Sequence, residues 1–129
     1  MFKNTYINIA SKDISKNRAF YQAIGLELVT DWSDDSTSSF KINDTTYLMV
    51  MSVEKFIGFT KSDLPNSFLL NEVILSFELD SKKAVDDLLL LVKSNGGSEF
   101  GSPTDSDFMY YRAFRDTDGH RLEVFNFKK

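Results

Sequence analysis

Residues 72–97, EVILSFELDSKKAVDDLLLLVKSNGG, contain the clearest change of hydrophobic periodicity in this 129-residue chain. The first part alternates around Leu75 and Phe77, which predicts a β-strand with one buried face. The second part predicts a helix that begins after Ser81, a suitable N-cap, and ends at Gly96. The apolar face expected on this helix consists of Ala84, Val85, Leu88, Leu89, Leu91 and Val92.

The first half of the chain repeats this order of elements. Residues 4–10 alternate as a strand, and a helix follows with Asp13 as its N-cap and Gly25 as its end. Its expected apolar positions are Ile14, Ala19, Phe20, Ala23 and Ile24. We predict a strand over 26–31 and then a hairpin that turns at Asn43–Asp44.

Both halves therefore predict a strand, a helix and three further strands. The second half ends with two strands joined by the turn DTDG, residues 116–119. We interpret the chain as one α+β domain of two βαβββ modules, 1–53 and 72–129, that form a curved mixed sheet. Residues 54–71 connect them and include a short helix over 54–59. A ferredoxin-like α+β fold is the alternative, but it needs fewer strands than the sequence predicts.

The composition excludes several kinds of chemistry. The chain has no cysteine and a single histidine, His120, so disulfides, thiolate nucleophiles and metal sites with two histidines from one chain are excluded. A net charge of −4 and the absence of a basic stripe argue against nucleic-acid binding. No apolar run is long enough to span a membrane, and no secretory signal begins the chain, so we expect a cytoplasmic protein.

Two stretches carry a resemblance to a known family. Residues 6–29, YINIASKDISKNRAFYQAIGLELV, and residues 114–125, FRDTDGHRLEVF, resemble the opening and closing segments of vicinal oxygen chelate proteins. This superfamily includes glyoxalase I, extradiol dioxygenases, and fosfomycin- and bleomycin-resistance proteins. The likeness is more detailed for a bacterial glyoxalase-like subgroup. It implies the paired βαβββ fold, a small-molecule site and, as is usual in the family, a homodimer.

The resemblance also implies positions for a metal site. Metal-dependent members use His and Glu ligands from inward-facing strand positions, which fall here at Tyr6, at Met49 or Met51, near Ile74, and at Glu123. Only Glu123 matches a family ligand. Divalent ions prefer oxygen or imidazole ligands, so we favour no cofactor. A divalent ion (Mg²⁺, Mn²⁺, Ni²⁺ or Zn²⁺) held by the carboxylates of Glu123 and Glu72 stays open as the alternative.

The alternation of the strands indicates which side chains would line a ligand site. Glu123 points away from its apolar neighbours, so it is the candidate general base or ligand anchor; the alternative is a structural ion pair with Arg112 or Arg121. The side chains expected on the same concave face are Tyr6, Asn8, Tyr47, Met49, Met51 and Phe125. Such a lining suits a flat, partly apolar ligand. Trp32 and the acidic residues after it are candidates to close over it.

These observations predict a glyoxalase/bleomycin-resistance-type protein that binds a small organic molecule without the full family metal site. The alternative is a metal-dependent lyase or related enzyme of the glyoxalase I or dioxygenase type, so the sequence leaves open whether a reaction is catalysed. A pure interaction domain is a third option, if side chains fill the cavity. The apolar residues expected at a dimer contact are Phe56, Phe59, Phe68 and Leu69.

Overall fold

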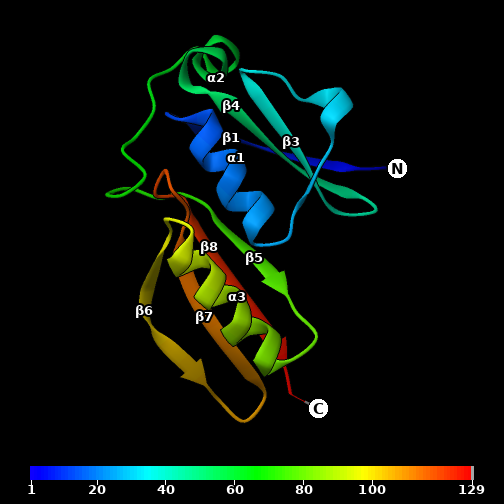
Figure 1. The fold of residues 1–129 in the computed structure, drawn as a ribbon, viewed down its shortest axis with the longest axis vertical. Helices are drawn as coiled ribbons and strands as arrows, with labels where there is room; N and C mark the ends of the chain where they lie inside the picture. Colours follow the sequence, from blue (N-terminus) through cyan, green and yellow to red (C-terminus); the bar gives the residue numbers. More distant parts are fainter. Residues whose placement is uncertain (129) are drawn as a thin grey trace. The chain divides into compact units, whose positions relative to one another are not determined.

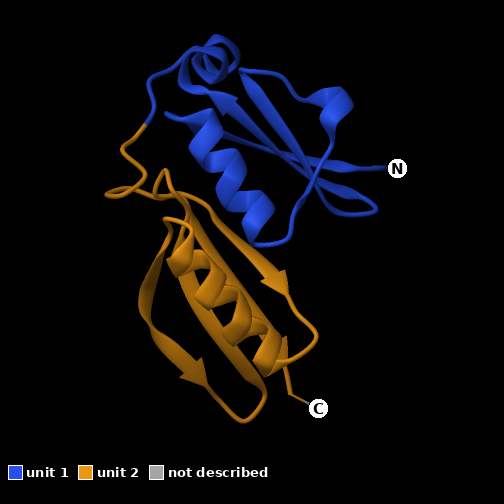
Figure 2. Ribbon diagram, in the orientation of Figure 1, with its two compact units in different colours: residues 1–64 blue, residues 65–129 orange. Residues whose placement is uncertain are grey.

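The computed structural model describes residues 1–128, and the described residues divide into two compact units, 1–64 and 65–128 (Figure 2). Each unit contains one four-stranded sheet. The strand order is β1-β4-β3-β2 in the first sheet and β5-β8-β7-β6 in the second, so both units have the same topology. In each, the first and last strands of the unit pair in parallel and the other pairs are antiparallel. The α+β fold of two βαβββ modules is confirmed.

The first unit follows the predicted order with one addition. A 3₁₀ turn, η1, separates the second and third strands. The elements are β1 (Thr5–Ser11), α1 (Ile14–Ala23), β2 (Glu27–Leu28), η1 (Thr30–Trp32), β3 (Thr37–Asn43), β4 (Thr46–Ser52) and α2 (Val53–Thr60). The short helix expected in the connector is therefore present, as α2, and so is the hairpin between β3 and β4.

The strand predicted over 26–31 is mostly wrong. Only β2 pairs with β3, and the chain then turns through η1. Serine side chains explain the turn: the Ser33 hydroxyl donates to the Val29 carbonyl at 2.7 Å, and the Ser39 hydroxyl donates to the Trp32 carbonyl at 2.8 Å. Such local bonds offer the backbone an alternative to a sheet ladder.

Helix α1 begins and ends where the sequence predicts. The Asp13 carboxylate accepts from the Lys16 backbone N–H at 3.0 Å, and Gly25 follows with a φ of 106°. Its buried side chains are Asn17, Phe20 and Tyr21. The prediction for Ala19 is wrong, since it is exposed, because the buried stripe is centred one position further along the helix.

The second unit repeats the order with a longer helix, which lies across one face of its sheet (Figure 1). Its elements are β5 (Ile74–Glu78), α3 (Lys82–Ser94), β6 (Ser98–Asp105), β7 (Met109–Arg115) and β8 (Arg121–Phe127). The Ser81 hydroxyl caps α3 by accepting from the Ala84 N–H at 3.0 Å, and Gly96 ends it with a φ of 94°.

The core of the second unit lies between α3 and the sheet. Val85, Leu89 and Val92 are fully buried on the helix. They face a sheet surface that includes the buried residues Phe114, Leu122 and Val124. Leu91, expected on the apolar face, is 43% exposed, because the buried residues recur at i, i+4 and i+7 and Leu91 lies outside that stripe.

Candidate functional site

Five of the predicted ligand-binding residues lie on one face of the first sheet. Strands β1 and β4 run in parallel with Tyr6 opposite Tyr47 and Asn8 opposite Met49. Leu48 and Val50, between them on β4, are fully buried, so the alternating residues face the other side of the sheet. We call this side the helix-free face of the first sheet. Its members from the prediction are Tyr6, Asn8, Tyr47, Met49 and Met51.

Aromatic rings dominate the N-terminal end of this face. The rings of Tyr6 and Tyr47 stack with centroids 5.3 Å apart and an interplanar angle of 13°. The Trp32 ring also contacts Tyr47, with centroids 5.3 Å apart and an interplanar angle of 53°. Tyr6 and Trp32 are each about half exposed, at 49% and 48%. Trp32 therefore lies beside the predicted residues, at the end of η1, where the 3₁₀ turn presents it.

Glu123 and Phe125 lie on the corresponding face of the second sheet. Leu122 and Val124 are buried toward α3, so Glu123 and Phe125 point to the opposite side, as the alternation predicts. Glu123 stands opposite Ser76 of β5, whose hydroxyl donates to Glu123 Oε1 at 2.7 Å. We call this side the helix-free face of the second sheet. Among residues 1–128, Glu123 accepts from Ser76 and forms no ion pair.

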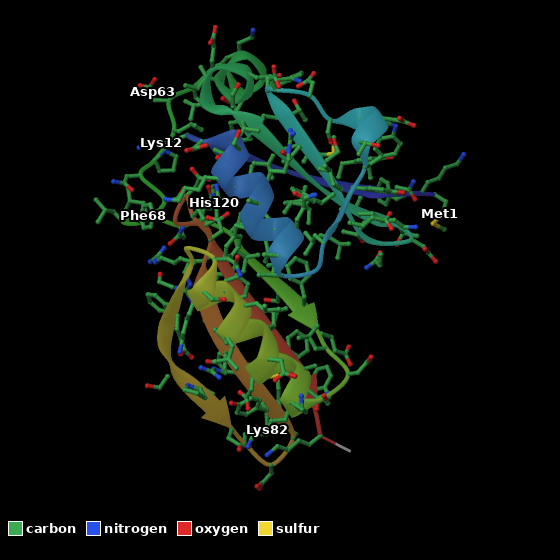
Figure 3. All side chains as sticks on the ribbon, in the orientation of Figure 1. Met1, Lys12, Asp63, Phe68, Lys82 and His120 are labelled. Carbon is green, nitrogen blue, oxygen red and sulfur yellow. The ribbon has the colours of Figure 1, made fainter. Side chains whose placement is uncertain are left out.

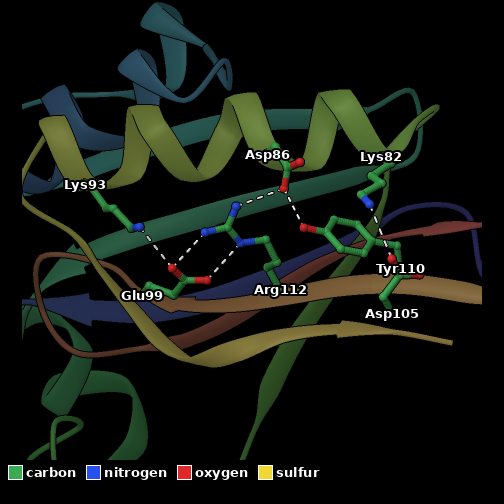
Figure 4. Close-up of polar contacts among 7 residues, drawn as sticks. All are labelled: Lys82, Asp86, Lys93, Glu99, Asp105, Tyr110 and Arg112. Atoms are coloured by element: carbon green, nitrogen blue, oxygen red, sulfur yellow. Dashed lines mark hydrogen bonds and ion pairs between the residues drawn. The ribbon is translucent and has the colours of Figure 1, made fainter.

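The ion pair proposed as an alternative for Glu123 is not formed with Arg112. Arg112 points to the α3 side, where its Nε and Nη2 donate to the two oxygens of Glu99, both at 2.8 Å (Figure 4). Its Nη1 donates to Asp86 of α3 at 2.9 Å. Because Glu123 lies one residue out of phase with this side of the sheet, the two side chains cannot meet.

Arg112 is the centre of a polar network that fastens α3 to the sheet. Lys93 adds a second cation to Glu99 at 3.0 Å, and the Tyr110 hydroxyl donates to Asp86 at 2.6 Å (Figure 4). The Arg112 guanidinium lowers the pKa of Glu99 to about 2, and Lys93 acts in the same direction. The hydrogen bond from Tyr110 lowers the pKa of Asp86. Every group in this network is paired within the protein, so we assign it to stability.

The turn before β8 places Glu123 and its neighbours. Buried Asp116 accepts from the backbone N–H groups of Asp118 at 2.9 Å and His120 at 3.0 Å. Gly119 has a φ of 90°, and Phe68 lies so close that a Cβ at Gly119 would meet its ring at 2.7 Å (Figure 3 labels Phe68 and His120). His120 thus belongs to a braced turn.

Sequence reasoning missed a cationic cluster on the helix-free face of the second sheet. Arg115 and Arg121 stand opposite each other on β7 and β8. The Arg121 guanidinium carbon lies 3.6 Å from the centroid of the Phe100 ring, and that of Arg115 lies 5.1 Å away. The signal in the sequence was the two-residue spacing of Arg121 and Glu123, which puts both on one face.

The predicted site residues thus fall into two sets, each within its own sheet. Tyr6, Asn8, Tyr47, Met49 and Met51 belong to the first unit, and Glu123 and Phe125 to the second. Glu72 belongs to neither face. It lies in an exposed bend before β5, which begins only at Ile74, so its expected position on that strand is wrong.

The side chains at the implied ligand positions do not fit the metal site of the family. The parallel strand pairs place Asn8 opposite Met49 in the first sheet and Ser76 opposite Glu123 in the second. The implied positions themselves carry a phenol (Tyr6), a thioether (Met49 or Met51), an aliphatic side chain (Ile74) and one carboxylate (Glu123). Even with the amide and hydroxyl of these neighbours added, this is a weak set for a divalent ion. Within residues 1–128, no three His, Asp or Glu side chains gather closely enough to hold one.

Comparison with known proteins identifies the family. A sequence model of the Glyoxalase/Bleomycin resistance protein/Dioxygenase superfamily matches residues 4–124. The chain belongs to this superfamily. No curated protein matches the chain.

Solved structures agree with this assignment. A hypothetical protein from S. aureus is 26% identical, with a TM-score of 0.85 over 98% of this chain and 95% of its own. A glyoxalase/bleomycin resistance protein/dioxygenase family enzyme from Burkholderia phytofirmans PsJN is 20% identical, with a TM-score of 0.80 over 94% and 95%. A glyoxalase-related enzyme from Fulvimarina pelagi is 15% identical, with a TM-score of 0.84 over 98% and 88%. The last two likenesses concern the fold.

The helices place one further bound on the chain. No helix formed by the described residues is both long enough and apolar enough to cross a membrane.

Proposed function

We propose that this chain binds a small organic molecule on the helix-free face of its second sheet, without a resident metal ion, and that Glu123 is the principal polar anchor. Phe125 supplies apolar surface beside Glu123. On the helix-free face of the first sheet, Tyr6 and Asn8 offer polar groups, and Tyr47, Met49 and Met51 offer apolar surface of the same kind. The observation that carries the proposal is the environment of Glu123. The residue is half-buried, and its carboxylate is held at 2.7 Å by Ser76 and forms no ion pair among residues 1–128.

Such a carboxylate retains acceptor capacity for a ligand. A carboxylate has about four lone-pair directions, and Ser76 uses one of them. The serine bond also fixes the orientation of the group, which limits the entropy lost when a ligand hydroxyl or amine binds. If the ligand carries an acidic C–H or O–H, the Glu123 carboxylate can accept that proton, so Glu123 is also the candidate general base.

A ligand screen tests the proposal directly. We expect an aldehyde–glutathione adduct, an aromatic acid or a cationic antibiotic to raise the melting temperature of the intact protein in a thermal-shift panel. Glu123→Gln keeps the shape of the side chain but removes its charge, so it should weaken binding of a responding compound by about 10-fold. Glu72→Gln is the matched control, because Glu72 is exposed in the bend before β5. Equal weakening by both variants would contradict the assignment of Glu123.

Elemental analysis tests the metal-free part of the proposal. Protein purified without chelators should contain well under one equivalent of Mg, Mn, Ni or Zn per chain, because only one of the four implied ligand positions carries a carboxylate. A chelator should leave the melting temperature unchanged. Stoichiometric metal that disappears in Glu123→Gln would replace this proposal with a metal-dependent lyase or related enzyme.

A further inference from the structure

The guanidinium of Arg121 has no hydrogen-bonding partner among the described residues. Nε of Arg121 is buried from solvent and has no hydrogen-bond acceptor, and the other nitrogens of the side chain make no hydrogen bond to any residue within 1–128. An arginine carries five N–H donors, and a buried donor left unpaired costs free energy. The side chain is therefore held in place by packing on Phe100 and not by an acid.

The neighbouring arginine does not share this condition. Nη1 of Arg115 donates to the Ser67 carbonyl at 2.9 Å, to Asn71 Oδ1 at 2.9 Å and to the Gly119 carbonyl at 2.7 Å. These bonds tie the loop before β5 to the turn before β8. Arg115 is thus a structural residue, and its positive charge remains beside Arg121 without a carboxylate between them.

The charges around Arg121 compensate it only in part. Arg115 stands opposite it across the strand pair and repels it. Glu123 lies two residues along the same strand, about 7 Å away by strand geometry, and its Oε1 is engaged by Ser76. Burial and the charge of Arg115 both lower the pKa of Arg121, and the opposing charge of Glu123 does not offset them. An anion at this position would relieve the imbalance.

The ring beneath the guanidinium fixes its direction. The guanidinium carbon of Arg121 is 3.6 Å from the centroid of Phe100, a stacking distance that holds the planar group against the ring. A guanidinium fixed in this way loses little further entropy when it binds, and its donors suit the two oxygens of a carboxylate or the oxygens of a phosphate. We propose that Arg121, stacked on Phe100, binds the anionic group of a small organic acid, either a carboxylate or a phosphate ester.

This inference rests on the proposed function, because it names the chemical class of the molecule bound on the helix-free face of the second sheet. The carboxylate of Glu123, two residues along the same face of β8, disfavours a second anionic group. The ligand therefore has one anionic end, at Arg121, and presents a hydrogen-bond donor or an uncharged surface toward Glu123.

The intact protein is titrated with four probes, and NMR monitors binding through the Nε–H resonance of Arg121. Benzoate and phenyl phosphate represent the two anionic groups, benzamide is the uncharged analogue of benzoate, and inorganic phosphate is the anion alone. We expect benzoate or phenyl phosphate to shift the Arg121 resonance in a saturable manner. Benzamide and inorganic phosphate should bind at least 10-fold more weakly.

Variants separate a binding role from a structural one. Arg121→Gln should weaken anion binding by at least 10-fold, and Arg121→Lys, which keeps the charge but loses the planar fork, should weaken it less. Lys83→Gln is the control, because it removes the same charge from an exposed site on α3. Melting temperatures show whether the variants fold. If Arg121→Gln does not fold, the resonance shift in the unmodified protein still tests the inference.

Different outcomes separate this inference from the proposed function. Uncharged compounds that bind through Glu123 while benzoate and phenyl phosphate leave Arg121 unmoved would overturn the inference and leave the proposed function standing. Equal affinity for inorganic phosphate and phenyl phosphate would overturn the assignment to an organic acid. A panel in which no small molecule binds would overturn both.

Discussion

At the scale of single residues, the bidentate pair between Arg112 and Glu99 carries the clearest prediction about stability. Glu99→Gln replaces one of the two anionic partners of the Arg112 guanidinium by a neutral amide, while Asp86 stays, so we expect a loss of about 1–3 kcal/mol in the free energy of unfolding near neutral pH. Urea denaturation measures this change. Glu72→Gln, in the exposed bend before β5, should change the free energy of unfolding by less than about 0.5 kcal/mol.

The same residue predicts a dependence on pH. The pKa of Glu99 is lowered from 4.5 to about 2, chiefly by its hydrogen bonds with Arg112. Because the folded-state pKa lies below the unfolded one, the stabilisation from Glu99 is complete above pH 4.5 and is lost as the pH falls toward 2. The free energy of unfolding should therefore fall less steeply over this range in Glu99→Gln. Parallel slopes for the two proteins would contradict the assignment.

At the scale of elements, α3 separates two leucines that look alike in the sequence. Leu89 is fully buried and Leu91 is 43% exposed. Leu89→Ala should therefore cost about 2–5 kcal/mol of stability, through lost burial and a residual cavity, while Leu91→Ala should cost well under half as much. Thermal and urea unfolding of the two variants check this. Similar losses would mean that the buried stripe of α3 is wider than the structure shows.

The turn before β8 carries a second prediction at this scale. Gly119 and Gly101 both have positive φ, at 90° and 70°, but only Gly119 has neighbours where a Cβ would lie. Gly101→Ala should cost about 1 kcal/mol from backbone strain alone. Gly119→Ala should cost clearly more, because Phe68 and its backbone must move by several tenths of an ångström. Unfolding measurements on the two variants would show equal losses if the contact with Phe68 were unimportant.

The element scale also shows why sequence reasoning succeeded for most strands and failed for one. Alternation and cap residues located β1, α1, β4, α3 and β8, because both signals depend only on residues that are neighbours in the sequence. The segment after Leu28 failed because Ser33 and Ser39 bond to backbone carbonyls that the periodicity does not reveal. The face of Glu123 followed from alternation, but its bond to Ser76 depends on the register between β5 and β8, which tertiary pairing sets. The cluster of Arg121 with Phe100 was missed for the same reason.

At the scale of the whole molecule, exposed apolar residues support the proposed homodimer. Phe68, Leu69 and Leu70 are consecutive and are 51%, 77% and 64% exposed. Contiguous apolar surface of this kind is commonly covered by a partner. Light scattering should therefore give about twice the 14.8 kDa mass of the chain. Leu69→Ser should shift the equilibrium toward monomer, whereas Leu90→Ser, on the exposed side of α3, should not. A monomer at all concentrations would contradict the proposal.

The two units share a topology, but their matching strand pairs carry unlike chemistry: Asn8 faces Met49 in one, and Ser76 faces Glu123 in the other. In a fold made of two repeats, one copy can keep a half-buried polar group such as the Glu123 carboxylate, while the matching position of the other copy accepts other side chains. Substitutions at Met49 that preserve volume should thus be tolerated far better than any at Glu123. Each protomer should also bind one ligand at saturation, although its architecture is present twice.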